Sequence, residues 1–193
     1  CGDRMYISNA TGCSSIWGGP AATSPYTVDA NGHGPAWANS LFEDNAEHGL
    51  GMYYGQLAIR ERLISKLEEM AAAEQTPAAT KDAIAKFMET KDNGADNAEP
   101  AKALVAELEK GAAAGCDACK EVLAHKEYLA KKSIWIFGGD GWAYDIGFGG
   151  LDHVLASGQD VNVMVFDTEV YSNTGGQASK ATNIGAVAQF AAS

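Results

Sequence analysis

The stretch Ile134-Trp-Ile-Phe-Gly-Gly-Asp-Gly-Trp-Ala-Tyr-Asp145 decides the fold. It opens with apolar residues and continues into a glycine-rich turn, which is typical of a buried strand. A helical stretch, residues 146–156, ends at Ser157-Gly158, and a second apolar run covers residues 161–166. A strand, a crossover helix and a second strand form a right-handed unit with parallel strands. The sequence therefore predicts an α/β protein with a mainly parallel sheet and flanking helices.

Both predicted strands end in polar loops that we expect to lie side by side. Asp140 occupies the Gly-Asp-Gly turn after the first strand, and the second strand ends in Asp167-Thr-Glu-Val-Tyr-Ser-Asn-Thr-Gly-Gly176. Open α/β sheets hold ligands at the carboxyl ends of their strands. The Asp140 carboxylate, the Thr168 hydroxyl and the Val170 carbonyl are oxygen donors of the kind that Mg²⁺ prefers. Because the flanking glycines let backbone N–H groups approach an anion, these motifs predict a magnesium diphosphate site.

The two motifs resemble those of thiamine diphosphate enzymes, which carry a Gly-Asp-Gly turn followed by an Asn-containing loop. Here Thr168 follows Asp140 by 28 residues (168 − 140), and Asn173 lies in the same loop. The longer text of residues 138–155 and 167–182 is closely similar to the pyruvate:ferredoxin (flavodoxin) oxidoreductase family. Residues 2–5, 9–19 and 35–47 extend this resemblance, so that only the middle third of the chain has no matching motif.

The resemblance implies that residues 1–193 are part of a thiamine-diphosphate-binding domain, at its diphosphate end. It implies oxidative decarboxylation of pyruvate to acetyl-CoA, with CoA as co-substrate and electrons passing through iron–sulfur clusters to ferredoxin or flavodoxin. Thiamine diphosphate, Mg²⁺ and a [4Fe–4S] cluster are the implied cofactors. The implied partners are the remaining domains of a parent enzyme and a second copy in a homodimer. We expect the chain alone to be inactive.

The same resemblance assigns roles to individual residues. It makes Asp140, Thr168 and Val170 magnesium ligands, and Cys13 a cluster ligand whose companions lie outside this chain. Asn173 would be catalytic, because the matching residue faces the reacting carbonyl. Most thiamine enzymes have Asn where Thr168 stands, so the metal here would use a hydroxyl. The implied cofactor-binding residues are Gly139, Asp140, Gly141, Trp142, Thr168, Glu169, Val170, Tyr171, Ser172 and Asn173.

Structural readings of the same residues stay open. Asp140 is also suited to capping a helix, Trp142 to core packing, and Asn173 to a left-handed turn position. A rival function is that of another 2-oxo acid:ferredoxin oxidoreductase or a non-oxidative thiamine decarboxylase. A fragment that binds the cofactor without catalysis is a rival from a different class.

Residues 55–132 read as a helical insertion. Apolar stripes predict helices over 56–73, from Thr76-Pro77 through Met88, from Glu99-Pro100 to near Gly111, and over about 114–131. Cys116 and Cys119 share one face of the last of these helices. This spacing favours free, structural thiols over a metal or redox role. Cys1 is expected at an apolar position.

Two further segments carry expectations. Asn39, Glu43, Asp44 and Asn45 read as a polar cluster in a loop that borders the site or caps a helix. Residues 181–192 read as a final helix.

Composition excludes some classes of protein. The chain has 193 residues, a formal net charge of −11 and 46% hydrophobic residues, enough for a packed core. Its acidic balance argues against nucleic acid as a partner, because phosphate backbones are bound by Lys and Arg. No apolar run approaches the ~20 residues that span a bilayer, so no membrane partner is expected. We expect a cytoplasmic protein, with a hydrogenosome-like organelle as the alternative.

Overall fold

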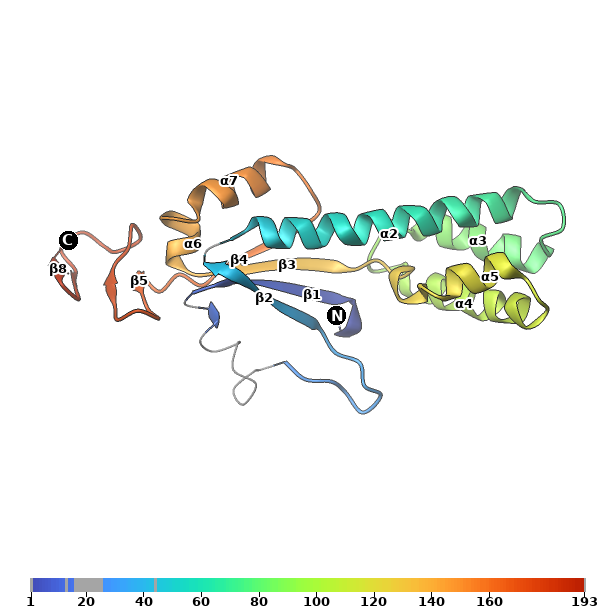
Figure 1. Ribbon diagram of the computed structural model, residues 1–193, viewed down its shortest axis with the longest axis horizontal. Coiled ribbons are helices and arrows are strands. Elements are labelled where there is room, and N and C mark those ends of the chain that lie inside the picture. Colours follow the sequence, from blue (N-terminus) through green and yellow to red (C-terminus); the bar gives the residue numbers. More distant parts are fainter. Residues whose placement is uncertain (1, 13, 16–25, 44, 193) are drawn as a thin grey trace. The chain divides into compact units, whose positions relative to one another are not determined.

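The computed structural model describes residues 2–12, 14–15, 26–43 and 45–192 (Figure 1). The chain divides into two compact units. The first unit consists of Cys1–Tyr53 and Ser133–Ser193, and the second of Tyr54–Lys132. In the part of the chain that the structure describes, no helix is both long and apolar enough to cross a membrane.

The first unit is built on a parallel sheet, which confirms the predicted α/β class. Its strands follow the order β2-β1-β3-β4. They are β1 (Met5–Thr11), β2 (Ala36–Glu43), β3 (Ser133–Gly138) and β4 (Asn162–Val165), and a 3-10 turn, Gly2–Arg4, precedes β1. Asn9 pairs with Phe137, and Gly138 pairs with Val165. The carboxyl ends of β1, β3 and β4 therefore lie at the same edge of the sheet.

The crossover between β3 and β4 differs from the single helix predicted over residues 146–156. A short helix, α6 (Asp140–Tyr144), begins inside the Gly-Asp-Gly turn, and α7 (Phe148–Ala156) follows after a break. The turn is tight because the Trp142 ring lies directly on Gly138, where an added Cβ would collide with it. Trp142 is fully buried with Ile136, Leu151 and other apolar residues. Packing of this indole therefore fixes how the chain leaves β3.

A long helix, α2 (Glu47–Ala72), begins in the first unit and continues into the second. Within the first unit its Leu50 joins the core, and Gly49 lies against the side chain of Ile136. A Cβ at Gly49 would come 2.5 Å from that side chain. Glycine at this position therefore sets how closely the start of α2 approaches the sheet.

The predicted polar loop around Asn39 and Glu43 is wrong, because both residues belong to strand β2. The strand pairs with β1, and the polar atoms of Asn39 are satisfied within the pair. Asn9 Nδ2 donates to Asn39 Oδ1 at 2.7 Å, and Asn39 Nδ2 donates to Thr11 Oγ1 at 3.1 Å. Asn45 accepts the His48 N–H at 3.2 Å, as a helix cap does. Asp44 lies outside the described residues.

The chain after β4 forms short hairpins. The first pairs β5 (Val170–Tyr171) with β6 (Gln177–Ala178), and the second pairs β7 (Val187–Ala188) with β8 (Ala191–Ala192). The helix predicted over residues 181–192 is therefore wrong. Gly185 has φ of +85° and Phe190 has φ of +64°, values that a right-handed helix cannot contain.

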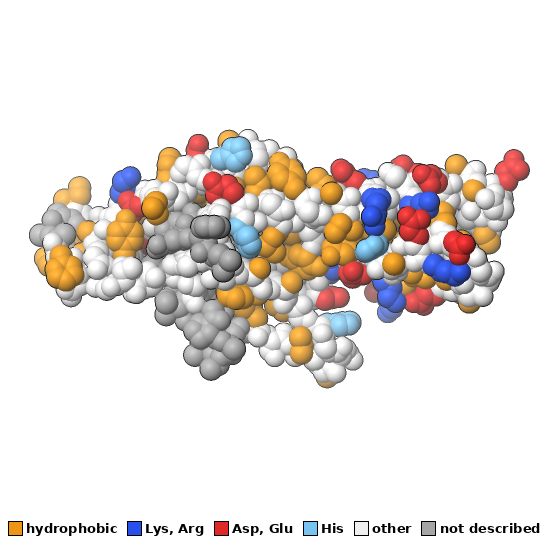
Figure 2. Space-filling model, viewed as in Figure 1, with side chains coloured by type: hydrophobic (Ala, Val, Ile, Leu, Met, Phe, Trp, Pro, Cys, Tyr) orange, Lys and Arg blue, Asp and Glu red, His pale blue; other side chains and the backbone are white. Residues whose placement is uncertain are grey.

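The second unit is a small helical bundle with its own core. Beside α2 it contains α3 (Ala78–Thr90), α4 (Ala98–Ala113), α5 (Asp117–Leu123) and a 3-10 turn, Lys126–Tyr128. Leu67, Phe87, Leu104 and Leu108 are its fully buried residues on α2, α3 and α4. The predicted helix starts near Pro77 and Pro100 are confirmed. On the face drawn in Figure 2, charged side chains of both signs gather over this unit.

The last predicted helix of this unit, over residues 114–131, is much shorter in the structure. It begins only at Asp117, with Cys116 as its cap: the Cys119 N–H donates to Cys116 Sγ at 3.1 Å. Gly115, at φ of +95°, separates it from α4. The expectation of free thiols is also wrong, because Cys116 and Cys119 form a disulfide. Because Cys116 is the cap residue of α5, its side chain points toward Cys119 in the first turn of the helix.

Arg60 ties α2 to two connecting segments of the second unit. Its guanidinium donates to the carbonyls of Leu129, at 3.3 Å from Nη2, and Lys91. Only 12% of its side chain is exposed, and Asp92 Oδ1 lies 4.0 Å from Nη1. Burial lowers the pKa of Arg60, and the negative charge of Asp92 opposes this shift. The side chain stays charged and fixes where the segments after α3 and α5 meet α2.

Candidate functional site

The site residues predicted from the two motifs come together at the carboxyl ends of β3 and β4. The Phe166 N–H donates to the Gly138 carbonyl at 2.8 Å, which extends the pairing of these strands by one residue. Asp140 then begins α6, and Thr168 lies two residues past Phe166. The Thr168 N–H donates to Asp140 Oδ1 at 2.8 Å, so the two loops are in direct contact.

Asp140 is the central residue of this site, and its side chain has no contact with solvent: its exposed fraction is 0%. Asp140 Oδ1 accepts from the Thr168 N–H, and Asp140 Oδ2 accepts from Ser179 Oγ at 2.8 Å. Both donors are neutral. Among the described residues, no Lys, Arg or His forms an ion pair with this carboxylate. A buried charge without a counter-charge is costly, and cation sites are one place where proteins keep such a group.

Thr168 Oγ1 lies near an oxygen atom of each of the other two predicted metal ligands. Thr168 Oγ1 lies 3.4 Å from Asp140 Oδ1 and 3.0 Å from the Val170 carbonyl oxygen. Two neighbouring oxygen ligands at about 2.1 Å from Mg²⁺ lie about 3.0 Å apart. Ser172 Oγ, at 3.4 Å from Thr168 Oγ1, adds a fourth oxygen nearby. The donor set therefore fits a hard cation that keeps further positions for other oxygen ligands.

The donor set contains a single carboxylate. In the described ranges no group of three or more His, Cys, Asp or Glu side chains is placed to hold a metal ion. Two of the three predicted ligands are a hydroxyl and a backbone carbonyl. Neither is a His, Cys, Asp or Glu side chain, so they do not count toward a group of that kind. A site of this composition suits Mg²⁺ together with an anionic ligand that supplies further oxygens.

Glu169, between the predicted ligands Thr168 and Val170, has a left-handed backbone with φ of +62°. This conformation is uncommon outside glycine, and non-glycine outliers gather at functional sites. Its side chain and carbonyl are held from the following segment: Asn183 Nδ2 donates to Glu169 Oε2 at 3.0 Å, and Thr182 Oγ1 donates to the Glu169 carbonyl. These contacts fix a turn after which the Val170 carbonyl accepts from Thr168 Oγ1.

The other predicted cofactor residues lie on both sides of these ligands. Gly139 and Gly141 are buried on either side of Asp140. Tyr171 ends β5, and its carbonyl accepts the Gly176 N–H at 2.9 Å. Asn173 is exposed in the turn between β5 and β6. The roles of these residues toward a cofactor or substrate stay predictions.

Trp142 lies in the core beneath the site rather than on its surface. It is fully buried, and its Nε1–H has no hydrogen-bond partner within the described part of the chain. This placement agrees with the core-packing role of Trp142. Its predicted role as a wall of the cofactor site stays a prediction.

Several contacts at the site were not anticipated from the sequence. Ser179 lies within the run that resembles the oxidoreductase family, yet 39 residues separate it from Asp140, and no local pattern links the two. Tyr144 OH donates to Asp167 Oδ2 at 3.0 Å and joins α6 to the loop after β4. This hydrogen bond raises the pKa of Tyr144, with smaller contributions from burial and from the charges of Asp167 and Asp140.

The predicted cluster ligand, Cys13, lies outside the described residues. Its role therefore stays a prediction. The neighbouring Ser14 is buried, and its hydroxyl donates to the Ala10 carbonyl at 3.3 Å, just after strand β1.

Fold and site together define an α/β protein in which the buried Asp140 carboxylate and the oxygens of Thr168 and Val170 lie close together at the carboxyl edge of a parallel sheet. Comparison with known proteins gives a more specific result. The chain is 54% identical over 197 residues to the pyruvate-flavodoxin oxidoreductase of Klebsiella pneumoniae, covering 99% of this chain and 16% of that protein. It is 56% identical over 197 residues to the pyruvate:ferredoxin oxidoreductase of Moorella thermoacetica, covering 99% and 17% respectively. These matches confirm the resemblance seen in the motifs.

A third relative has a different name. The mitochondrial pyruvate dehydrogenase [NADP(+)] of Euglena gracilis is 46% identical over 190 residues, covering 98% of this chain and 10% of that protein. No family model matches the chain. The chain thus corresponds to one segment, about one sixth of the length, of the curated oxidoreductases it matches.

Proposed function

We propose that this chain is the part of a pyruvate:ferredoxin or pyruvate:flavodoxin oxidoreductase that binds the magnesium ion and diphosphate of thiamine diphosphate. One observation carries the proposal: the Asp140 carboxylate is fully buried and accepts hydrogen bonds from neutral donors, next to the oxygens of Thr168 and Val170. A bound Mg²⁺ would supply the missing positive charge. The similarity to named pyruvate oxidoreductases over nearly the whole chain supports the substrate.

Asp140, Thr168 Oγ1 and the Val170 carbonyl would hold Mg²⁺. Because Asp140 is buried, its attraction for the metal would be screened less than at the surface. The Thr168 N–H and the Ser179 hydroxyl would keep the carboxylate oriented, as outer-shell hydrogen bonds do at metal sites. Gly139 and Gly141 would allow the diphosphate to approach the backbone.

Bound thiamine diphosphate supplies the electron sink that allows a 2-oxo acid to lose carbon dioxide. The residues of this chain would position the reactants. The Asn173 amide would donate a hydrogen bond to the carbonyl oxygen of pyruvate or a related 2-oxo acid. Glu169, Tyr171 and Ser172 would complete the walls around the cofactor, and Trp142 would support them from the core beneath.

The rest of the reaction requires parts beyond this chain. Cys13 would ligate a [4Fe–4S] cluster together with cysteines from elsewhere, and electrons would pass on to ferredoxin or flavodoxin. CoA would accept the acetyl group. The complete enzyme would be a homodimer of the cytoplasm or of a hydrogenosome-like organelle. The chain by itself would bind magnesium and cofactor without turnover.

The test is a titration of the chain with Mg²⁺ and thiamine diphosphate, followed by calorimetry, for the wild type, Asp140→Asn and Asp152→Asn. Asp140→Asn keeps the shape of the side chain and should abolish magnesium-dependent cofactor binding. Asp152→Asn removes an exposed carboxylate on α7 that is no proposed ligand, and binding should stay unchanged. If the Asp140→Asn protein bound Mg²⁺ and thiamine diphosphate with wild-type affinity, Asp140 would not be a metal ligand.

A further inference from the structure

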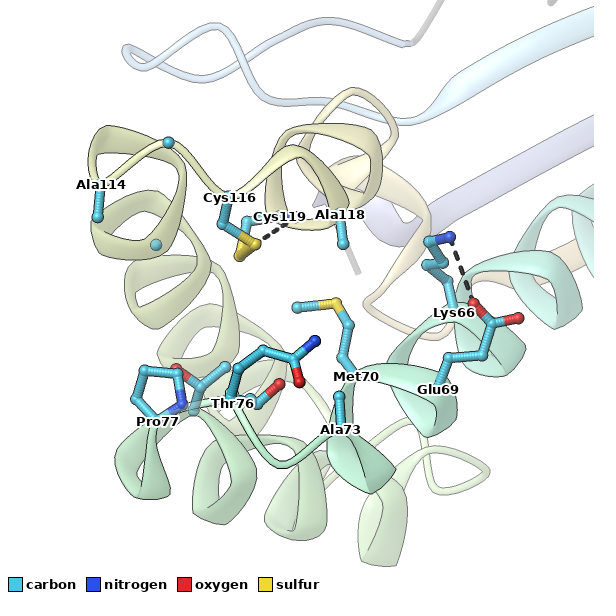
Figure 3. Close-up of a pocket in the computed structure, with 14 residues that line it drawn as sticks. Lys66, Glu69, Met70, Ala73, Thr76, Pro77, Ala114, Cys116, Ala118 and Cys119 are labelled. Atoms are coloured by element: carbon cyan, nitrogen blue, oxygen red, sulfur yellow. Dashed lines mark hydrogen bonds and ion pairs between the residues drawn. A yellow bond between two sulfur atoms is a disulfide. The ribbon is translucent and has the colours of Figure 1, made fainter.

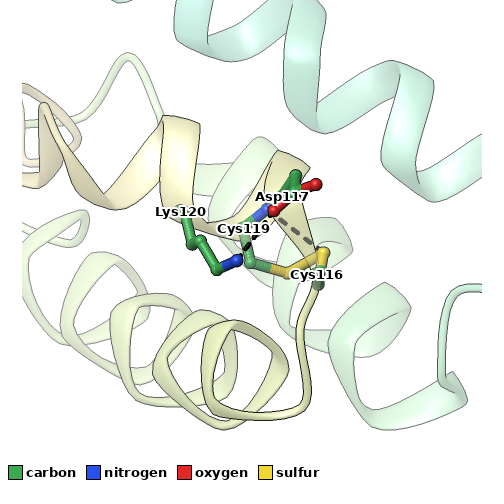
Figure 4. Close-up of a disulfide and its surroundings, with 4 residues drawn as sticks. All are labelled: Cys116, Asp117, Cys119 and Lys120. Atoms are coloured by element: carbon green, nitrogen blue, oxygen red, sulfur yellow. Dashed lines mark hydrogen bonds and ion pairs between the residues drawn. A yellow bond between two sulfur atoms is a disulfide. The ribbon is translucent and has the colours of Figure 1, made fainter.

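The disulfide between Cys116 and Cys119 lies at the start of α5 in the second unit (Figure 4). The two sulfurs have different surroundings. Cys119 is 3% exposed and its Sγ packs on Gly111, where an added Cβ would come within 2.6 Å. Cys116 is half-buried. A reagent that reaches this pair therefore meets the Cys116 sulfur first.

The backbone holds the two cysteines together independently of the S–S bond. Their Cα atoms are 5.3 Å apart, and the Lys120 N–H donates to the Cys116 carbonyl at 3.2 Å. The stabilisation that a disulfide provides grows with the length of the loop it closes, and this loop is very short. Opening and closing of the bond should therefore leave the bundle folded, as reversible chemistry requires.

A cavity of about 550 Å³ lies directly beside the disulfide, and both cysteines line it. Figure 3 shows the sulfurs on one wall, with Met70 and Thr76 facing them across the space. The volume falls within the range of small-molecule sites. Besides the two cysteines and five polar or charged residues, the lining consists of alanine, glycine, methionine and proline, so the cavity suits an apolar carbon skeleton.

The charges at this cavity disfavour an anionic ligand. The charged residues that line it are Lys66 and Glu69, and the Lys66 ammonium lies 3.3 Å from both Glu69 and Glu121. One ammonium shared by two carboxylates leaves a net negative charge. A neutral molecule is therefore preferred to an anion of the same size.

From these observations we propose that Cys116 and Cys119 form a thiol–disulfide exchange site for neutral, low-molecular-mass thiols whose carbon chains occupy the adjacent cavity. The thiolate of the incoming thiol attacks Cys116 Sγ and forms a mixed disulfide. The S–S bond breaks, and its electron pair leaves on Cys119, which takes up the proton lost by the thiol. A second thiol attacks the small sulfur of the mixed disulfide and releases Cys116 as a thiol. Two electrons thereby pass from two thiols to the pair, and the small disulfide is the other product.

The first experiment compares the two cysteines in the 193-residue chain. Cys119→Ser and Cys116→Ser each retain one cysteine of the pair, and each protein is treated with the symmetrical disulfide of mercaptohexanol. Peptide mass spectrometry follows the adducts at residues 116 and 119. Cys116 should react at least about tenfold faster than Cys119, because access limits exchange. Equal rates, or faster reaction at Cys119, would overturn the proposal.

The second experiment needs no variant and tests the cavity in the wild-type chain. The rate of opening of the disulfide is measured with mercaptohexanol, mercaptoethanol and mercaptoethanesulfonate, each corrected for its rate with a small model disulfide. Mercaptohexanol should be the fastest and the sulfonate the slowest, by about tenfold between the extremes. The same corrected rate for all three would show that the cavity takes no part, and so contradict the proposal.

A cavity-filling substitution gives a matched control. Ala73→Phe should slow opening by mercaptohexanol several-fold, while the reaction of the Cys119→Ser, Ala73→Phe protein with the smaller methyl methanethiosulfonate should not change. An equal loss with both reagents would indicate general damage to the site and argue against the cavity as the binding element. Circular dichroism establishes that the variants are folded.

Discussion

Asp140 is a buried carboxylate that accepts hydrogen bonds from neutral donors. In the absence of a cation this arrangement is unfavourable, because an ion loses its hydration on burial without an opposite charge to replace it. The hydrogen bonds from Thr168 and Ser179 reduce the desolvation cost of the buried carboxylate, and the proposed metal would offset the rest. Asp140 thus links two loops that the pairing of β3 and β4 brings to this edge of the sheet.

Tyr144, which donates a hydrogen bond to Asp167, is expected to make a pH-dependent contribution to the stability of the fold. The bond raises the pKa of Tyr144 above its ordinary value of 10.0, followed in size by burial. Because the protonated phenol is favoured, the stabilisation is fully present below the pKa of the unfolded state and is lost as the pH rises through the folded-state pKa. Asp167→Asn should lower the pKa of Tyr144, as measured by NMR of isotope-labelled tyrosine. Tyr144→Phe assigns the signal, and an unchanged pKa would contradict the role of Asp167.

At the scale of elements, two of the three glycines of helix α2 have opposite roles. A Cβ at Gly49 would collide with Ile136, whereas nothing lies within 4 Å of a Cβ at Gly51. Gly49→Ala should lower the free energy of unfolding by about 1–3 kcal/mol, since overpacking displaces the helix from the sheet. Gly51→Ala should raise it by about 0.5–1 kcal/mol, because alanine loses less conformational entropy in a helix. Urea unfolding measures both, and a stabilised Gly49→Ala protein would show that the contact is loose.

The same helix offers a second matched pair, Arg60 and Arg62. Arg60 donates to the Leu129 and Lys91 carbonyls, whereas Arg62 is exposed. Arg60→Met should cost about 1–3 kcal/mol of stability, because buried carbonyls lose a charged donor. Arg62→Met should change stability by less than about 0.5 kcal/mol. If both substitutions had the same effect in thermal unfolding, the hydrogen bonds of Arg60 would contribute nothing to the stability of the fold.

At the scale of the whole molecule, each of the two units has its own buried core. Amide hydrogen exchange should report them separately, because contiguous segments open as cooperative units. Mg²⁺ at 100 times its Kd should stabilise the first unit by about 2.7 kcal/mol and slow exchange around residues 138–172. Exchange in residues 54–132 should not change. Slowing throughout the chain, or none in the Asp140 loop, would contradict binding at the proposed site.

The elements that could be predicted from the sequence are those with a local signal. Strands β3 and β4 are apolar runs bounded by glycine or a polar loop, and α3 and α4 begin beside prolines. Strand β2 was not predicted because Asn39 is polar, and its hydrogen bonds are made with Asn9 and Thr11 of another strand, β1. The helix predicted at 181–192 failed because alanine content does not reveal that Gly185 and Phe190 adopt left-handed backbones.

The sequence by itself determined the α/β class and the two loops that meet at Asp140, because the burial of a segment and the position of its turn follow from local periodicity and glycine placement. Only the tertiary structure decided that Ser179 reaches Asp140, that no basic side chain of the described residues pairs with it, and that Cys116 and Cys119 are bonded beside a cavity. The contact of Ser179 with Asp140, 39 residues away, and the cavity lined by α2, α4 and α5 both join separate elements. They depend on how whole elements pack, which no short stretch of sequence records.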